Sequence, residues 1–233
     1  MENIDANEMK TFMKKGIRMR YLPSLMTQWE QKKNKPQIKP FLGNLTKLYK
    51  AIQKCTNSKV IVDTSKHSGY GYMLNLIPEI DLYIIHLVRD PRAVAYSWLK
   101  KKVQPDKKET IYISRYSPFK SCLQWNIRNF FAEYFWKKTN KYLLLRYEDF
   151  IDNPKESLSQ ALELVKEKSD DIPFIDGHKV KLGINHGIWG NPSRFQMGEI
   201  ELKKDEEWKV KMKSIDKVLS TVYTLPLLLK YRY

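Results

Sequence analysis

The chain has 233 residues, enough for one α/β domain with a substantial core or for two small domains. Lys and Arg outnumber Asp and Glu by 42 to 26, and this excess favours an anionic partner such as a nucleotide, nucleic acid, anionic lipid or sulfated product. A solvated Lys-rich surface without a partner would give the same excess. Two cysteines exclude a disulfide framework, and no apolar run approaches the roughly 20 residues of a membrane span, so we expect a cytoplasmic protein.

Residues 1–58 are the least readable part, a helical or linker region interrupted by Lys- and Pro-rich connections. Within it, apolar side chains at helical spacing predict a helix over 41–54 that faces the core. A short apolar strand is predicted over 59–62, followed by the polar run DTSKHSG and a helix over 70–77.

Lys66 and His67 are the reactive-looking pair in this polar run. Open α/β sheets place their chemistry just past the carboxyl ends of strands. A lysine supplies a fixed positive charge there, and a neutral histidine can accept a proton. The alternative is a helix-capping loop that contains an incidental histidine.

The stretch 81–102 is the clearest in the chain. Residues 82–88 predict a strand buried on both faces, and Asp90-Pro91 predicts a helix start that continues through Trp98 into Lys100–Lys102. Arg89, at the strand end, has the side chain best matched to a phosphate, and Ser97 follows two turns into the helix. A right-handed strand–helix–strand unit would make the two polar strand ends neighbours. The alternative is a structural Arg–Asp pair.

The segment LVRDPRAVAYSW resembles the 3′-phosphate-binding segment of the sulfotransferase family. The resemblance implies that Arg89 and Ser97 hold the 3′-phosphate of 3′-phosphoadenosine 5′-phosphosulfate (PAPS). VIVDTSKHSGY ahead of it is similar to the order in bacterial sulfotransferases, which implies that Lys66 contacts the transferred sulfuryl group. His67 is then the candidate general base, although other branches of the family use a Glu near an N-terminal nucleotide loop.

Two further segments extend this resemblance. Helical spacing over 117–138 predicts aromatic core residues rather than a base-stacking surface, and 141–146 is the third predicted strand. RYEDFIDNP, after that strand, resembles the segment whose Tyr reaches the adenine, which gives Tyr147 this role and leaves Glu148 and Asp149 structural. Glycines around Arg194 suit an anion-closing loop, and GNPSRF resembles a bacterial branch in which such an Arg completes the 3′-phosphate site. His186 is a loop brace or a second base candidate.

The front of the chain departs from the family pattern. Sulfotransferases open with a strand and a G-x-x-R-S-G-T loop around the 5′-phosphosulfate, and nothing before Val60 fits. We therefore expect residues 1–233 to form a single but N-terminally incomplete domain. Its expected fold is a P-loop-NTPase-like α/β domain, a parallel sheet flanked by helices that lacks the first strand and loop.

The predicted function is sulfuryl transfer from PAPS to a hydroxyl or amine group of a small-molecule or glycan acceptor, without a metal. The missing loop predicts weakened or absent activity for this chain alone, with a surviving affinity for 3′-phosphorylated adenosine nucleotides. The alternatives are a remnant that only binds such a nucleotide or another polyanion, and a basic nucleic-acid-binding module whose affinity falls steeply with salt. The sequence indicates no oligomeric state and leaves the acceptor open.

Overall fold

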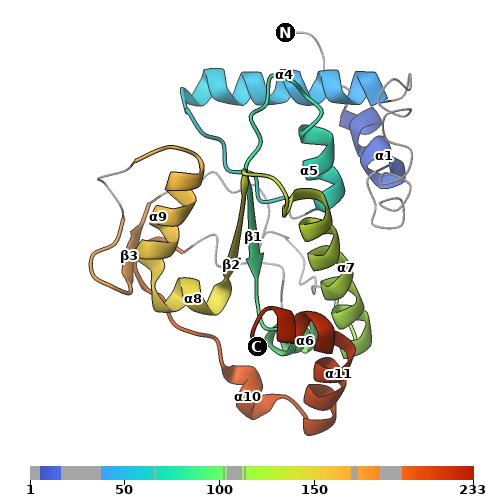
Figure 1. Cartoon of the computed structure of the whole chain (residues 1–233), viewed down its shortest axis with the longest axis vertical. Coiled ribbons are helices and arrows are strands. Elements are labelled where there is room, and N and C mark those ends of the chain that lie inside the picture. Colours follow the sequence, from blue (N-terminus) through green and yellow to red (C-terminus); the bar gives the residue numbers. More distant parts are fainter. Residues whose placement is uncertain are drawn as a thin grey trace. The chain divides into compact units, whose positions relative to one another are not determined.

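The computed structural model describes residues 6–16, 38–65, 67–101, 103, 112, 114–168, 173–183 and 196–233. The chain divides into two compact units, Met1–Tyr83 with Phe130–Lys138 and Ile84–Asn129 with Thr139–Tyr233. The fold is mixed α/β, with a small parallel sheet and flanking helices (Figure 1). This agrees with the predicted class at that level.

The described elements of the first unit are helical. They are α1 (Ala6–Gly16), α4 (Ile38–Thr56), α5 (Ser68–Leu74) and the last part of α7 (Pro118–Trp136). The predicted helix over 41–54 is confirmed as part of α4. Phe12 stacks on Phe41 with ring centroids 4.3 Å apart, and Leu45 is fully buried, so the apolar face of α4 does form a core.

The strand predicted over 59–62 is wrong. These residues form no strand, and Val60 and Val62 are 42% and 82% exposed. The Asp63 Oδ1 accepts a hydrogen bond from the Ser65 N–H at 2.7 Å, which closes a local turn directly after the apolar residues. Three apolar residues bury too little surface to hold an isolated strand. The expected strand–helix–strand unit is therefore not formed by the described residues.

The second unit contains the parallel pair β1 (Ile84–Val88) and β2 (Tyr142–Arg146). Their register sets Ile84 opposite Tyr142 and Val88 opposite Arg146. The strand predicted over 141–146 is thus confirmed. The connection between β1 and β2 contains α6 (Pro91–Leu99) and α7, as a parallel crossover requires.

The two faces of β1 differ in exposure. His86 and Val88 are buried, whereas Ile85 and Leu87 are 48% and 54% exposed. The prediction of a strand buried on both faces is therefore wrong. Among the described residues β1 pairs with β2 alone, and the core cluster of Val88, Trp125 and Tyr231 lies on the more buried face.

The other elements of this unit follow β2 in the chain. They are α8 (Tyr147–Asp152), α9 (Pro154–Leu164), the antiparallel pair β3 (Lys179–Leu182) and β4 (Gly198–Glu201), α10 (Glu207–Lys211) and α11 (Ser214–Lys230). A second core cluster joins α6, α7 and the α10 region through Ala93, Ala95, Cys122, Trp208 and Met212. Helix α6 ends at Leu99, and the backbone of Lys100 is extended. The predicted continuation of this helix into Lys100–Lys102 is therefore wrong.

The buried His86 is held between two side chains. Its Nδ1 lies 2.6 Å from the Tyr142 hydroxyl and its Nε2 lies 2.7 Å from Asn129 Oδ1. The Asn129 amide nitrogen donates to the Trp125 carbonyl at 2.7 Å, so its oxygen faces the histidine and Nε2 carries the proton.

Replacing Asn129 with alanine is expected to lower the free energy of unfolding by about 1–3 kcal/mol, because a buried donor loses its acceptor. Urea denaturation of the full chain measures this. The matched control is Asn126→Ala on the same helix, whose amide makes a more exposed bond to the Tyr223 carbonyl. Equal losses in the two variants would contradict a special role for the buried bond.

Candidate functional site

The candidate site lies where β1 ends and α6 begins. Because Val88 pairs with Arg146, the next residues of the two strands, Arg89 and Tyr147, are neighbours. The Arg89 Cζ lies 4.5 Å from the centre of the Tyr147 ring, a cation–π contact. Sheet register therefore brings together two residues that are 58 positions apart in the sequence.

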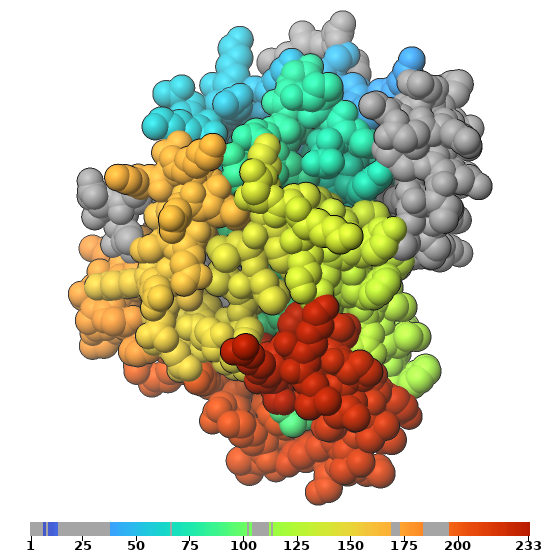
Figure 2. All heavy atoms as spheres, viewed as in Figure 1, coloured from blue at the N-terminus to red at the C-terminus, as the bar shows by residue number. Residues whose placement is uncertain are grey.

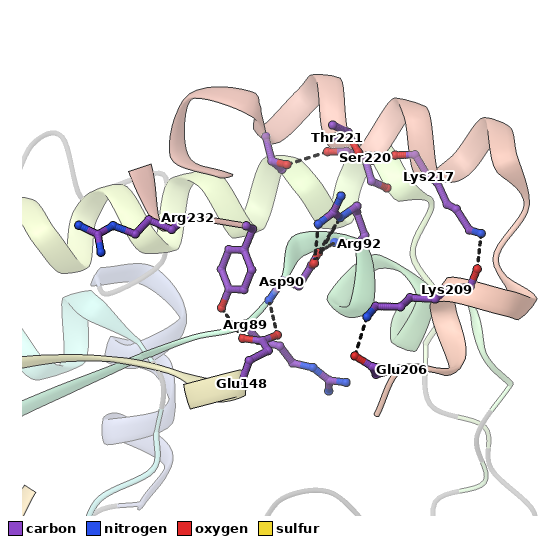
Figure 3. A network of polar contacts seen from close by, with 12 residues as sticks. Arg89, Asp90, Arg92, Glu148, Glu206, Lys209, Lys217, Ser220, Thr221 and Arg232 are labelled. Atoms are coloured by element: carbon purple, nitrogen blue, oxygen red, sulfur yellow. Dashed lines mark hydrogen bonds and ion pairs between the residues drawn. The ribbon is translucent and has the colours of Figure 1, made fainter. Parts of the chain in front are cut away.

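Helix α6 begins as its sequence predicts. Asp90 is the N-cap, and its Oδ1 accepts from the Arg92 N–H at 2.8 Å, with Pro91 in the first turn. The Arg92 guanidinium returns to the same carboxylate at 2.7 Å, and this ion pair raises the pKa of Arg92 (Figure 3). Arg92 and Asp90 thus form a structural Arg–Asp pair at the cap, and Arg89 itself pairs with Asp205, so the alternative of a structural pair at the strand end stays open.

Two side chains fix the peptide group that joins Arg89 to Asp90. Trp125 Nε1–H donates to the Arg89 carbonyl at 3.0 Å. The Asp90 N–H donates to Glu148 at 3.1 Å, and the other oxygen of Glu148 accepts from the Tyr233 hydroxyl at 2.6 Å. Burial, followed by the hydrogen bond to Glu148, raises the pKa of Tyr233. The strand end is therefore held by rigid contacts, as a binding residue requires.

The Arg89 guanidinium already binds an anionic group, the carboxylate of Asp205. The Arg89 Nη2 lies 3.0 Å from Asp205 Oδ2. Partial burial acts to raise the pKa of the Asp205 carboxyl, but the hydrogen bond and charge of Arg89 outweigh it, so this pKa lies below its ordinary value. The Arg89 Nε is buried and has no hydrogen-bond partner among the residues that the structure describes, so one donor of the planar fork is not used by them.

Asp205 belongs to a segment that we call the strap, Lys204–Glu207, held to this unit by ion pairs. Lys204 binds Asp152 at 2.5 Å, and Glu207 binds Lys100 at the end of α6. The hydrogen bonds of Glu207 to Lys100 and Lys211 lower its pKa from 4.5 to about 2. Pairs this exposed contribute little to stability, because water and salt screen their charges, so the strap is weakly held.

The ion pairs of Glu207 that hold the strap should weaken in acid. A carboxylate whose folded pKa is lowered stabilises the fold above its unfolded pKa, and this stabilisation disappears as the pH falls through the folded pKa. For Glu207 the window runs from about pH 4.5 down to about pH 2. Glu207→Gln should therefore reduce stability at neutral pH, and the gap from wild type should close across this window in urea titrations.

The control for this experiment is Glu199→Gln, which removes an exposed carboxylate of β4. It should show a smaller gap from wild type over the same range. A Glu207→Gln gap that stays constant from neutral pH to pH 2 would contradict the assignment of the pH dependence to this residue.

The structure places some of the predicted site residues together and leaves others undescribed. Arg89 and Tyr147 are in contact, and Ser97 lies on α6, two turns from Arg89 and partly buried. His67 lies in the other unit, where it precedes α5 and makes no side-chain cap hydrogen bond. The predictions for Lys66, His186 and Arg194 fall outside the described residues.

Sequence reasoning missed Asp205 and Tyr233. The signal for Asp205 was weak, an acidic residue inside the mixed-charge run LKKDEEWK. Its pairing with Arg89 joins positions 116 residues apart, which no local pattern indicates. Tyr233 ends a run of apolar and basic residues, and only its contacts with Glu148 and the Val88 carbonyl, at 2.6 and 3.1 Å, reveal a bracing role.

The candidate site is thus an arginine at the carboxyl end of a parallel strand, paired with a carboxylate of the same chain. The sequence model of the family described as "Sulfotransferase domain" matches residues 11–176, well over half of the chain. The chain therefore belongs to the sulfotransferase family. The match includes Arg89, Ser97 and Tyr147 and ends before Arg194. It also starts far ahead of Val60, in a region where the sequence itself indicated no resemblance.

No similar curated protein and no similar solved structure was found. Among the helices that the structure describes, none is both long and apolar enough to cross a membrane. Within the same residues, no group of three or more His, Cys, Asp or Glu side chains is arranged to hold a metal ion.

Proposed function

We propose that the chain binds PAPS through the Arg89 site and transfers its sulfuryl group to a hydroxyl or amine acceptor. Membership of the sulfotransferase family supports the reaction class. The net charge of +16 suits an anionic nucleotide. The observation that carries the proposal is the geometry of Arg89, whose guanidinium stacks on Tyr147 and binds a carboxylate at 3.0 Å.

A phosphate suits this guanidinium better than the single carboxylate oxygen of Asp205. The fork of an arginine donates two parallel hydrogen bonds to two oxygens of one phosphate, and such bidentate pairs are the stronger kind. The Arg89 Nη2 donates to Asp205, while the buried Nε has no hydrogen-bond partner within the described part of the chain. We infer that a 3′-phosphate displaces Asp205 and takes both donors, with the Ser97 hydroxyl as a further donor from α6.

Tyr147 is proposed to position the adenine. A tyrosine offers a flat apolar face for stacking and a hydroxyl for a hydrogen bond. Its contact with Arg89 fixes the ring beside the phosphate-binding group, so base and 3′-phosphate would be held by adjacent residues.

PAPS supplies an activated sulfuryl group. We propose that His67 removes the proton from the acceptor hydroxyl or amine while the acceptor oxygen or nitrogen forms its bond to sulfur. The bond from sulfur to the phosphate oxygen breaks, and adenosine 3′,5′-bisphosphate leaves. Lys66 is assigned to the negative charge that develops on the sulfuryl and leaving oxygens. These two roles are proposed from sequence order and the family resemblance.

Isothermal titration calorimetry of the full chain tests the nucleotide site. Adenosine 3′,5′-bisphosphate should bind clearly tighter than adenosine 5′-phosphate, which lacks the 3′-phosphate. Equal affinities, or no binding at millimolar ligand, would overturn the proposal. Release of adenosine 3′,5′-bisphosphate from PAPS in the presence of phenol, alcohol, sugar and amine acceptors then tests the transfer itself.

A further inference from the structure

A carboxylate and two phenols form a polar cluster in the first unit that the proposed reaction does not use. The Tyr49 hydroxyl of α4 donates a hydrogen bond to Asp63 Oδ2 and lies 3.2 Å from the Tyr70 hydroxyl of α5. The other oxygen, Asp63 Oδ1, accepts from the Ser65 N–H at 2.7 Å and from the Ser65 hydroxyl. We call Tyr49, Asp63, Ser65 and Tyr70 the Asp63 clamp. Figure 2 shows the chain from α4 to α5, coloured light blue to turquoise, at the surface of the molecule.

The two phenols of the clamp are held in place by the packing of α4 against α5. Tyr49 follows the fully buried Leu45 by one helical turn, so its ring lies on the inner face of α4. Tyr70 is only 8% exposed. Burial, followed by the hydrogen bond to Asp63, raises the pKa of Tyr49. The Tyr49 hydroxyl therefore keeps its proton at neutral pH and remains a donor to the carboxylate.

In the sequence, the clamp lies on both sides of the proposed catalytic pair. Asp63 and Ser65 precede the pair, and Tyr70 follows it. The His67 carbonyl accepts from the N–H groups of Tyr70 and Gly71, each at 3.0 Å, so the start of α5 fixes the backbone on the far side of the pair. Residues of the clamp therefore anchor the chain both before and after the two side chains that are proposed to react.

The segment in front of the pair depends on the clamp for its position. Residues 60–65 lie in neither helix nor strand, so side-chain hydrogen bonds rather than a backbone ladder set their path. A reacting group must be held to within about half an ångström, because a small displacement costs much of the rate. We propose that Tyr49 and Asp63 are positioning residues for sulfuryl transfer, which hold the loop that carries Lys66 and His67 in its reactive position. This proposal rests on the proposed function, since it takes those two residues as the catalytic pair.

The contacts of Asp63 favour positioning over a direct part in the proton transfer. Both carboxylate oxygens already accept hydrogen bonds from the same chain, one from Tyr49 and the other from Ser65. The Tyr49 hydroxyl is committed in the same way, because it donates to Asp63 and lies beside the Tyr70 hydroxyl. A group that touched the acceptor would have to break these contacts, whereas a positioning group works only while they are kept. Removing one of them should slow the chemical step without weakening the nucleotide site, which is proposed to lie at Arg89 in the second unit.

Steady-state kinetics of the full chain, with PAPS and whichever phenol, alcohol, sugar or amine it sulfates, tests the proposal. Tyr49→Phe removes the hydroxyl and keeps the ring, so the fold should be retained. Its kcat should fall about tenfold or more, while its Kd for adenosine 3′,5′-bisphosphate, measured by calorimetry, should stay within about twofold of wild type. The matched control is Tyr83→Phe, which loses a 2.9 Å hydrogen bond to Asp81 in the same unit and should keep wild-type kinetics.

Two variants of Asp63 test whether the contact itself matters. Asp63→Ala should lower kcat as Tyr49→Phe does, and the double variant should lose little more, because both changes break the same contact. Asp63→Asn keeps one oxygen acceptor and should recover part of the rate. If the wild-type chain transfers the sulfuryl group and Tyr49→Phe lowers kcat no more than Tyr83→Phe, this proposal alone is overturned. If the wild-type chain transfers nothing, the proposed function is overturned, and this proposal with it.

Discussion

Replacing Arg89 with alanine is expected to weaken binding of adenosine 3′,5′-bisphosphate roughly ten- to a hundredfold, the effect of losing hydrogen bonds between charged partners. The affinity for adenosine 5′-phosphate should change much less, because that nucleotide lacks the group that Arg89 is proposed to hold. Calorimetric titrations of both nucleotides measure the difference. A loss confined to the 3′-phosphorylated ligand is the signature of direct recognition.

Arg115→Ala is the matched control for this variant. It removes the same charge from an exposed arginine of the same unit, whose Nε donates to the Leu99 carbonyl. Its effect should be limited to weaker long-range attraction and should vanish as salt is added. Equal losses in the two variants would show that Arg89 contributes only to the general positive field. Unfolding of the Arg89 variant is not expected, because its partner Asp205 is 44% exposed and stays hydrated.

The local signals of the sequence predicted the elements around the site well. Asp90 and Pro91 indicated the start of α6, and the structure shows the cap hydrogen bond and the proline in the first turn. The apolar run before Arg146 indicated β2, and its parallel register with β1 places Arg89 beside Tyr147. Cap geometry and strand formation depend on neighbouring residues, which is why a single sequence suffices to predict them.

Predictions that depended on tertiary burial were less successful. Residues 59–62 have the composition of a strand, but their exposed valines and the turn at Asp63 show that nothing in the described structure pairs with them. Ile85 and Leu87 of β1 remain exposed for the same reason, since burial of a strand requires a covering layer as well as apolar residues. On α7, Phe131 is buried but Phe130 and Tyr134 are each 52% exposed, so only part of the aromatic flank is core.

The second large expected effect comes from the contact between Asp205 and Arg89. Removing the Asp205 carboxylate should raise the affinity for the nucleotide. Asp205→Asn should bind adenosine 3′,5′-bisphosphate about three- to tenfold tighter than wild type. In the wild-type chain the 3′-phosphate must first break the Arg89–Asp205 pair, and the displaced carboxylate remains a nearby negative charge. The amide removes both penalties. Calorimetry at low salt, where charge effects are largest, measures the change.

A second Arg–Asp pair of the same unit provides the control. Arg146 and Asp149 also lie 3.0 Å apart, and Asp149 is similarly exposed, so Asp149→Asn removes the same charge and the same kind of ion pair without freeing Arg89. The affinity of Asp149→Asn for adenosine 3′,5′-bisphosphate should stay close to that of wild type. If Asp205→Asn binds the nucleotide no tighter than Asp149→Asn, Asp205 does not compete for the phosphate. If Asp205→Asn loses nucleotide binding, the Asp205 carboxylate must instead belong to the nucleotide site. The strap would then have to remain in place for Arg89 to hold its ligand.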